Sequence, residues 1–160
     1  MKVLVGVGDL KISDNPDDIL TTFALATCVG LTAYSPETRV MGMTHIMLPH
    51  APSYTVGMQN PGKYADTAVA ALLSLMVRRF MCPASTLELR MFGGAESVLS
   101  TQGSGLFNIG PRNTDTVISE LFRMKMLSSV KQKEVGGHHY RTLYAEASSG
   151  NVIVTTGQLV

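Results

Sequence analysis

The alternation of hydrophobic and polar residues along the chain predicts more strands than helices. Leu87, Leu89 and Met91 alternate with polar residues, which is typical of a strand with one buried face. Other stretches are almost continuously apolar, and two of them flank a short run of turn residues in each of two places, which predicts two β-hairpins. The expected strands are 3–7, 23–34, 39–48, 87–91, 140–147 and 152–156, with hairpins joining 23–34 to 39–48 and 140–147 to 152–156.

Two segments carry the spacing of three to four residues that is typical of helices. Apolar residues recur at that spacing over 65–76, after Pro61, which suits the first helical position. Pro83 prevents this helix from continuing. A second helix is expected to begin with Asn113 or Thr114 as its N-cap and to end among cations. The segments 9–18 and 49–62 are expected to be polar and loop-like, respectively.

The order of these elements predicts a fold of the α/β class in the broad sense, a layered α/β sandwich. Hairpins favour mixed, largely antiparallel sheets, and two main helices are expected to cover them. The chain has 160 residues, which is the length of one ordinary domain, so we expect a single domain over 1–160.

Composition and charge exclude several function classes. Lys and Arg number 13 against 12 Asp and Glu, a formal net charge of +1, and no run of like charge is present to bind phosphate backbones. Nucleic acid is therefore not an expected partner. The longest apolar stretch, 68–77, is far shorter than the ~20 residues that cross a bilayer, so no membrane insertion is expected. The first residues lack the pattern of a secretory signal, which makes the cytoplasm the expected compartment.

The only two cysteines, Cys28 and Cys82, are not spaced as C-x-x-C, so they predict neither a disulfide framework nor a cysteine-rich zinc site. Cys82 has no histidine at a comparable position and is expected to be structural. Nucleotide binding has no support either, because Gly6-x-Gly8 lacks the third glycine of a dinucleotide fingerprint. Any cysteine chemistry therefore depends on Cys28 as a lone thiol.

Cys28 has a candidate partner in the first expected hairpin. A turn centred between Pro36 and Glu37 places Cys28 opposite His45 on the same side of an antiparallel pair. The thiolate is the nucleophilic form of cysteine, and a neighbouring imidazolium stabilises it and later protonates a leaving group. A register shift of one residue would send the two side chains to opposite faces.

A third group is expected to orient the imidazole. Thr21, Thr22 and Thr44 are the hydroxyls within reach along the sequence. Thr22 lies roughly 20 Å from Cys28 along a straight strand, so it contributes only if the chain bends between them.

Structural alternatives exist for both members of the pair. A lone Cys in an apolar strand is a buried small hydrophobe in most proteins, and His45 is also consistent with a hydrogen-bonded core histidine. A zinc site that combines His138 and His139 with His45 or His50 is a weaker alternative, because adjacent histidines point to opposite sides of a strand.

Several sequence elements, taken together with the spacing of Thr22, Cys28 and His45, resemble one known family. The elements are residues 45–49 (His-Ile-Met-Leu-Pro), 61–68 (with Lys-Tyr-Ala-Asp), 93–95 (Gly-Gly-Ala), 108–113 (Asn-Ile-Gly-Pro-Arg-Asn), and Gly136-Gly137 with Arg141. In this order they resemble the chemoreceptor glutamine deamidases, the CheD family of bacterial and archaeal chemotaxis. The resemblance spans nearly the whole chain.

The resemblance implies a hydrolase that converts glutamine side chains of chemotaxis receptors to glutamate and releases ammonia. The implied fold is similar to that of deamidating-toxin cysteine hydrolases. Carried over by position, Cys28 is the nucleophile, His45 the general base and acid, and Thr22 the residue that orients His45. Receptor cytoplasmic domains and a CheC-type phosphatase are the implied partners, and neither a metal nor an organic cofactor is implied.

The chain departs from the family next to the nucleophile. The family usually has Gly-x-Gly-Ser-Cys, whereas this chain has Ala24 and Ala26 in place of the two glycines. The alternative function is therefore a non-catalytic adaptor that binds chemoreceptors or a CheC-type phosphatase. We also expect the 49–62 loop to border the substrate groove, with Tyr54 or Met58 touching the receptor.

Overall fold

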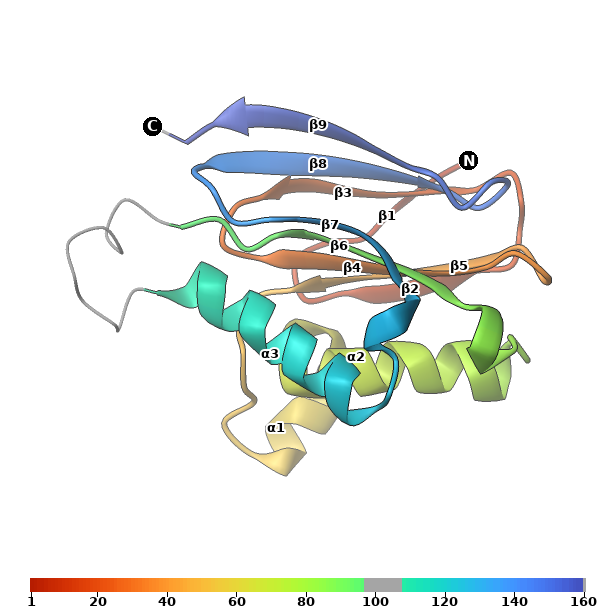
Figure 1. Ribbon diagram of the computed structural model, residues 1–160, viewed down its shortest axis with the longest axis horizontal. Helices are drawn as coiled ribbons and strands as arrows, with labels where there is room; N and C mark the ends of the chain where they lie inside the picture. The colour runs from red at the N-terminus through yellow and green to blue at the C-terminus, as the bar shows by residue number, and fades with distance from the viewer. Residues whose placement is uncertain (97–107, 160) are drawn as a thin grey trace.

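The computed structural model describes residues 1–96 and 108–159, and in it two β-sheets and a group of helices form three layers (Figure 1). The four-stranded sheet has the order β1-β3-β8-β9 and the five-stranded sheet the order β2-β5-β4-β6-β7. The strands are β1 (Lys2–Leu4), β2 (Leu10–Ser13), β3 (Ile19–Leu25), β4 (Val29–Ser35), β5 (Val40–Ile46), β6 (Glu88–Gly93), β7 (Val130–Val135), β8 (His139–Glu146) and β9 (Val152–Gln158).

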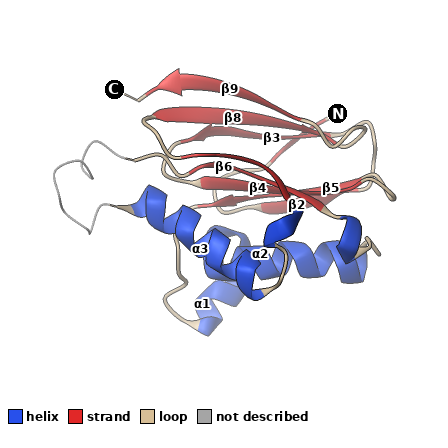
Figure 2. Ribbon diagram, viewed as in Figure 1, coloured by secondary structure: helices blue, strands red, loops and turns tan. Residues whose placement is uncertain are grey.

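The helices lie together on the outer face of the five-stranded sheet (Figure 2). The two main ones are α2 (Ala65–Ser74) and α3 (Ile109–Arg123), and α1 (Tyr54–Gln59) is shorter. The remaining helical segments are short, namely Pro61–Lys63, Leu75–Arg79, Ala84–Thr86 and Leu127–Ser129. Among the described residues, no helix is long and apolar enough to cross a membrane.

The expectation of mixed, largely antiparallel sheets is confirmed. β1 pairs with β3 and β6 with β7 in parallel, while the other pairs in both sheets are antiparallel. The terminal hairpin forms as expected from β8 and β9, and the alternating segment 87–91 forms most of β6. The layered sandwich with two main helices is therefore the observed fold class.

The two central strands, β4 and β5, are buried along their whole length. One face of this sheet packs against the helices, where Leu31 and Ile46 join Leu72 of α2 in one cluster. The other face packs against the four-stranded sheet, where Met43 joins Leu20 in a second cluster. Because both faces are covered, these strands consist of almost continuous apolar residues rather than alternating ones.

The expected strand over 23–34 is wrong as a single element. Its first residues end β3 in the four-stranded sheet, and its later residues form β4 in the other sheet, so the chain changes sheets between Leu25 and Val29. The pairing of β3 with β8 shifts register between Thr22 and Leu25, which is a β-bulge. The sequence pattern does not mark this change because the residues on both sides of it are mostly apolar.

Three further expectations need correction. Helix α1 forms inside the expected 49–62 loop, where the Ser53 hydroxyl accepts a hydrogen bond from the Val56 backbone N–H at 3.2 Å. Strand β2 forms inside the polar segment 9–18, as the edge of a sheet. Helix α3 begins at Ile109, so Asn113 is an interior residue of the helix and not its cap.

Candidate functional site

Thr22 and His45 meet in the layer between the two sheets. Thr22 lies on β3 and His45 on β5, and their side chains are 0% and 2% exposed. Thr22 Oγ1 lies 2.7 Å from His45 Nδ1, which is hydrogen-bond distance. Of the three hydroxyls considered from the sequence, Thr22 is therefore the one that contacts the imidazole. The Thr44 hydroxyl instead donates to the Gly62 carbonyl at 3.0 Å.

A second hydrogen bond of Thr22 fixes the protonation of the imidazole. Thr22 Oγ1 donates its proton to the Val5 carbonyl oxygen at 2.7 Å, and a carbonyl can only accept. The Thr22 oxygen must therefore accept from His45, which places the imidazole proton on Nδ1. His45 Nε2 is left with a free lone pair, the form in which it takes a proton from a nucleophile.

The backbone around His45 is held on both sides. The His45 N–H donates to the Asp9 carbonyl at 3.0 Å, and its carbonyl accepts from the Gly8 N–H at 2.8 Å. Burial lowers the pKa of His45 from 6.5 to about 4, although the Asp9 carboxylate acts in the opposite direction. The imidazole is therefore neutral at pH 7, in agreement with the protonation that Thr22 imposes.

Cys28 lies in the short connection between β3 and β4, directly before Val29. This connection is held against the end of β6 by backbone hydrogen bonds. The Gly94 N–H donates to the Cys28 carbonyl at 2.8 Å, and the Ala95 N–H donates to the Ala26 carbonyl at 2.8 Å. The Gly-Gly-Ala element thus supports the turn that carries the cysteine.

Gly93 has to be a glycine for this support to exist. Its φ is +101°, a conformation that other residues rarely adopt, and a Cβ atom there would lie 2.2 Å from the Cys28 carbonyl oxygen. The buried guanidinium of Arg141 also holds this residue in place, because its Nη1 donates to the Gly93 carbonyl at 3.3 Å.

The register of the β4–β5 hairpin differs from the expected one by two residues. His45 pairs with Gly30, not with Cys28, because the turn is centred between Glu37 and Thr38. A shift of two residues keeps the parity of the strand, so the side chain of residue 28 stays on the expected side. Accordingly, Cys28 packs on the cluster between the sheets, to which Met43, two residues before His45, also belongs.

The structure therefore brings Thr22 and His45 into direct contact and places Cys28 beside the same layer. Cys28 is partly exposed, and among the described residues its Sγ makes no hydrogen bond to His45. Burial raises the pKa of the Cys28 thiol from 9.0 to about 11. The expected thiolate is thus not the resting form in this geometry, and the pair rests as a neutral thiol and a neutral imidazole.

The β-bulge in β3 is the bend that Thr22 requires. At its centre, Ala24 has a φ of +54°, in the left-handed region. Ala24 occupies one of the two positions where the family usually has glycine, and glycine adopts this conformation without the clash of a Cβ atom. The bulge and the change of sheet both lie between Thr22 and Cys28, so the chain between them is not a straight strand.

The other histidines do not join this site. His50 Nδ1 lies 3.5 Å from an Asp66 carboxylate oxygen, and His138 Nε2 lies 3.8 Å from a Glu96 carboxylate oxygen. Over residues 1–96 and 108–159, no three His, Cys, Asp or Glu side chains form a group that could hold a metal ion. Cys82 is buried in the cluster under the helices, as expected of a structural cysteine.

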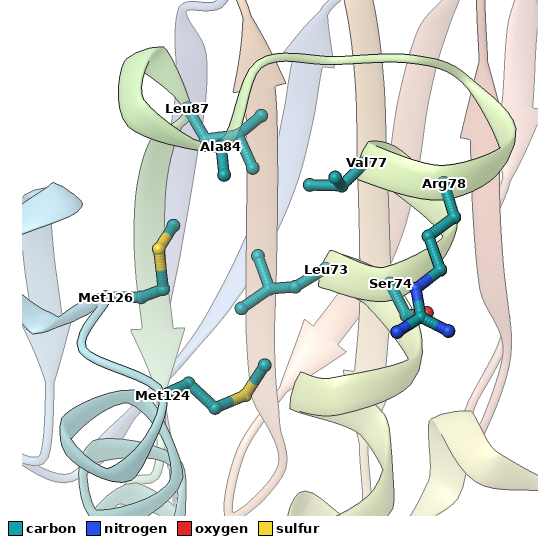
Figure 3. Close-up of a pocket in the computed structure, with 8 residues that line it drawn as sticks. All are labelled: Leu73, Ser74, Val77, Arg78, Ala84, Leu87, Met124 and Met126. Carbon is teal, nitrogen blue, oxygen red and sulfur yellow. The ribbon is translucent and has the colours of Figure 1, made fainter.

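Two hollows on the helical layer lie outside this constellation. Leu73, Val77 and Met124 help to line a mainly apolar pocket of about 260 Å³ between the end of α2 and the turn after α3 (Figure 3). Tyr54 and Met58 line a groove of about 420 Å³ between α1 and α2. Cys28, His45 and Thr22 line neither of them.

One residue of the site was missed from the sequence. Asn113 is fully buried, and its Nδ2 donates to the Thr27 carbonyl at 3.0 Å and to the Met47 carbonyl at 3.1 Å. It therefore joins the residue before Cys28 to a residue just beyond His45. Its place in the Asn-Ile-Gly-x-Arg-Asn element was the available signal, but the polar side chain suggested a helix cap.

Comparison with known proteins identifies the family. The family model described as CheD chemotactic sensory transduction matches residues 47–156. The probable chemoreceptor glutamine deamidase CheD of Symbiobacterium thermophilum is 35% identical over 152 residues, covering 95% of this chain and 90% of that protein. The chemoreceptor glutamine deamidase CheD of Bacillus licheniformis is 32% identical over 154 residues, covering 96% of this chain and 89% of that protein.

A solved structure supports the fold. YlmD from Geobacillus stearothermophilus aligns with a TM-score of 0.51 over 94% of this chain and 61% of that chain, at 11% sequence identity. That likeness is consistent with an α/β sandwich and concerns the fold alone. The family-model match covers most of the chain and the full-length relatives exceed 30% identity, so this chain belongs to the CheD family.

Proposed function

We propose that this chain hydrolyses the side-chain amide of glutamine residues in chemotaxis receptors. In this proposal Cys28 is the nucleophile, His45 is the general base and acid, and Thr22 orients His45. The observation that carries it is the hydrogen bond of 2.7 Å between Thr22 Oγ1 and His45 Nδ1, which leaves Nε2 free to accept a proton. Family membership supplies the substrate class.

The reaction runs in two halves that balance. Cys28 Sγ attacks the carboxamide carbon while Nε2 of His45 takes the thiol proton, which gives a tetrahedral intermediate. His45 returns that proton to the amide nitrogen, ammonia leaves and a thioester remains. A water molecule, deprotonated by Nε2, then attacks the thioester, and the thiol is regenerated by the same proton. Glutamine and water thus yield glutamate and ammonia.

The neutral resting pair is compatible with this sequence of steps. Because the pKa of Cys28 is raised and that of His45 is lowered, proton transfer accompanies attack instead of preceding it. Substrate binding brings the thiol and Nε2 together, since catalytic hydrogen bonds are often long in the free enzyme and tighten in the complex.

The decisive experiment is mass spectrometry of a receptor cytoplasmic fragment after incubation with the protein. We expect glutamine-to-glutamate conversion with the wild type and none with Cys28→Ala. Cys82→Ala is the matched control, because it removes the other thiol, which is buried away from this site, and should leave conversion intact. Absence of conversion by the folded wild type would refute the proposal.

The groove lined by Tyr54 and Met58 is the proposed contact for the receptor segment. Both residues lie on α1 in the helical layer and are exposed, at 82% and 54%. Replacing both by Ala is expected to raise KM for the receptor fragment and to leave kcat unchanged. An unchanged KM would remove the groove from the proposal while leaving the chemistry untouched.

A cytoplasmic location and a CheC-type phosphatase as second partner are further parts of the proposal, as is the folding of 1–160 as a single domain. The resemblance of the sequence to the family supports the partner and the location, and the length of 160 residues supports the single domain. Size-exclusion chromatography of the protein mixed with a CheC-type phosphatase tests the partner, and co-elution is expected. Separate elution at micromolar concentrations would contradict it.

A non-catalytic adaptor is the second candidate, and the left-handed conformation of Ala24 next to the nucleophile favours it. Its basis is the replacement of the two family glycines by Ala24 and Ala26, because glycine adopts a positive φ without strain. The same mass-spectrometry experiment separates the two functions. An adaptor binds the receptor fragment without converting any glutamine, whereas a deamidase converts it.

A further inference from the structure

The paired strands that carry the site open at a defined point. Their ladder ends with Val29 opposite Ile46, and one further step would pair Cys28 with Met47. That step does not form, and at this point the Met47 N–H donates to the Lys63 carbonyl at 2.8 Å and the Cys28 carbonyl accepts from Gly94. Cys28 thus lies at the mouth of a fork between β4 and β5.

The side chain of Asn113 occupies this fork. The two arms of the fork are the chain before Val29 and the chain after Ile46. Asn113 Nδ2 donates one hydrogen bond to each arm, to the Thr27 carbonyl at 3.0 Å and to the Met47 carbonyl at 3.1 Å. Of the two polar atoms of the Asn113 side chain only the nitrogen can donate, so its two carbonyl partners determine the orientation of the amide. Its Oδ1 is buried and has no hydrogen-bond partner among the described residues.

That unpartnered oxygen indicates what the residue is for. A buried amide oxygen without a partner is costly, whereas an apolar side chain here would leave the Thr27 and Met47 carbonyls without these donors. The residue is fully buried, so contact with solvent does not explain it. The free-energy cost of the unpartnered Oδ1 is therefore offset by the two hydrogen bonds of Nδ2, which hold the Thr27 and Met47 carbonyls at a set spacing.

The helix that carries Asn113 is a rigid support. Val117 and Leu121, on the following turns of α3, are fully buried in the cluster under the five-stranded sheet. The first turn of α3 also touches the segment that holds the Cys28 turn, since a Cβ on Gly110 would lie 1.9 Å from the Ala95 carbonyl oxygen. Asn113 is therefore fixed relative to both arms of the fork.

We propose that Asn113 is a positioning residue that sets the separation of the Cys28 thiol and the His45 imidazole by spacing the two arms of the fork. This inference rests on the proposed function, because it concerns the same thiol and imidazole. Loss of the two N–H groups frees the Thr27 carbonyl next to Cys28 and the Met47 carbonyl beyond His45. A displacement of about 1 Å between reacting groups lowers rates on the order of 100-fold.

Three substitutions separate hydrogen-bond donors from volume. Asn113→Asp keeps the shape but cannot donate when ionised, Asn113→Leu keeps the volume without donors, and Asn113→Ser is smaller but retains one donor. If donors matter, kcat should decrease in the order Asn, Ser, then Asp and Leu, with KM unchanged. If only packing matters, Leu and Asp should retain more activity than Ser, which would overturn the inference.

The matched control is Thr116→Val on the same helix. The Thr116 hydroxyl donates to the Arg112 carbonyl at 2.8 Å, away from the fork, so its loss tests the effect of one missing hydrogen bond in α3. We expect its kcat to stay within about twofold of the wild type, against a loss of roughly 100-fold for Asn113→Leu. All variants are assayed well below their measured melting temperatures.

A second readout does not depend on catalysis. Iodoacetamide labelling followed by peptide mass spectrometry gives the rate for Cys28 relative to that for buried Cys82. Local release of the fork should raise the Cys28 rate alone in Asn113→Leu, by about tenfold if local opening becomes frequent. An unchanged ratio would overturn the inference. A changed ratio together with an inactive wild type would instead remove the proposed function and keep the positioning role.

Discussion

Thr22 and His45 belong to different sheets, and the 2.7 Å hydrogen bond between them spans the layer that separates these sheets. The imidazole is therefore oriented from the opposite sheet and not by a neighbour on its own strand. Because the Val5 carbonyl, directly after β1, accepts the hydrogen bond of the Thr22 hydroxyl, Thr22 must accept from His45 Nδ1, and Nε2 is the ring nitrogen left with a free lone pair. Sheet packing and the protonation state of the site are thus coupled.

Removing the Thr22 hydroxyl should impair catalysis more than stability. Thr22→Val keeps the shape but leaves the His45 Nδ1–H without its acceptor, so the ring loses its orientation. We expect kcat for receptor deamidation to fall by roughly 100-fold, the usual size of a general-base contribution. Thr22→Ser retains the hydroxyl and should stay within about tenfold of the wild type. Equal rates for Val and Ser would contradict the role of Thr22.

The lowered pKa of His45 predicts how stability depends on pH. The unfolded chain takes up a proton on this residue below pH 6.5, but the folded chain does so only near pH 4. The unfolded state therefore binds more protons between these values, and the free energy of unfolding falls as pH decreases from 6.5 to 4, by about 3 kcal/mol at most.

His45→Asn is the control for that pH dependence. Its amide N–H can still donate to Thr22, but it does not titrate. Urea unfolding at pH 7.5 and pH 4.5 should show a loss for the wild type that is clearly larger than the loss for His45→Asn. Parallel losses in the two proteins would assign the acid sensitivity to other groups.

The sequence predicted the layered fold because hairpins and helices follow local rules, and β8, β9 and α2 form where periodicity placed them. It could not predict the change of sheet between Leu25 and Val29, since the apolar run over 23–34 has the pattern of one strand. The register failed for a related reason. Residues 36–39 allow turns centred at either of two positions, and the choice depends on contacts far away in the sequence.

In the candidate site, too, some features could be predicted from the sequence and others depend on tertiary structure. Cys28 and His45 were identifiable from residue chemistry and motif order, and Thr22 only through a bend that local propensity does not reveal. Ala24 adopts a left-handed conformation that favours glycine, so nothing in its side chain predicts the bulge. Asn113 was identifiable as polar and helical, but its partners on Thr27 and Met47 are set by tertiary packing alone.

The raised pKa of Cys28 predicts its reactivity toward alkylation. With a pKa of about 11, the thiolate fraction of the free protein keeps increasing with pH through the neutral range. The rate of iodoacetamide labelling at Cys28 should therefore increase about tenfold per pH unit between pH 7 and pH 9. A plateau below pH 8 would show that a thiolate already exists in the resting enzyme.

Ala24→Gly should stabilise the protein. Ala24 is exposed and has a φ of +54°, so the substitution removes strain without removing a buried contact. We expect a gain of about 1 kcal/mol in the free energy of unfolding, with deamidation at least as fast as in the wild type. Ala26→Gly is the matched control. Ala26 has no positive φ, so this substitution adds backbone flexibility and relieves no strain. A gain for Ala26→Gly equal to that for Ala24→Gly would rule out the strain.

Gly93→Ala should disrupt the turn that carries Cys28. The new Cβ would lie 2.2 Å from the Cys28 carbonyl oxygen, in a residue whose φ is +101°. Gly136→Ala separates the two effects, because Gly136 also has a positive φ, +83°, but a Cβ there meets no atom within 4 Å. Gly136→Ala should cost about 1–2 kcal/mol and leave deamidation unchanged. Gly93→Ala should cost more and abolish deamidation, and a folded, fully active Gly93→Ala would show that the position of the Cys28 backbone does not govern the chemistry.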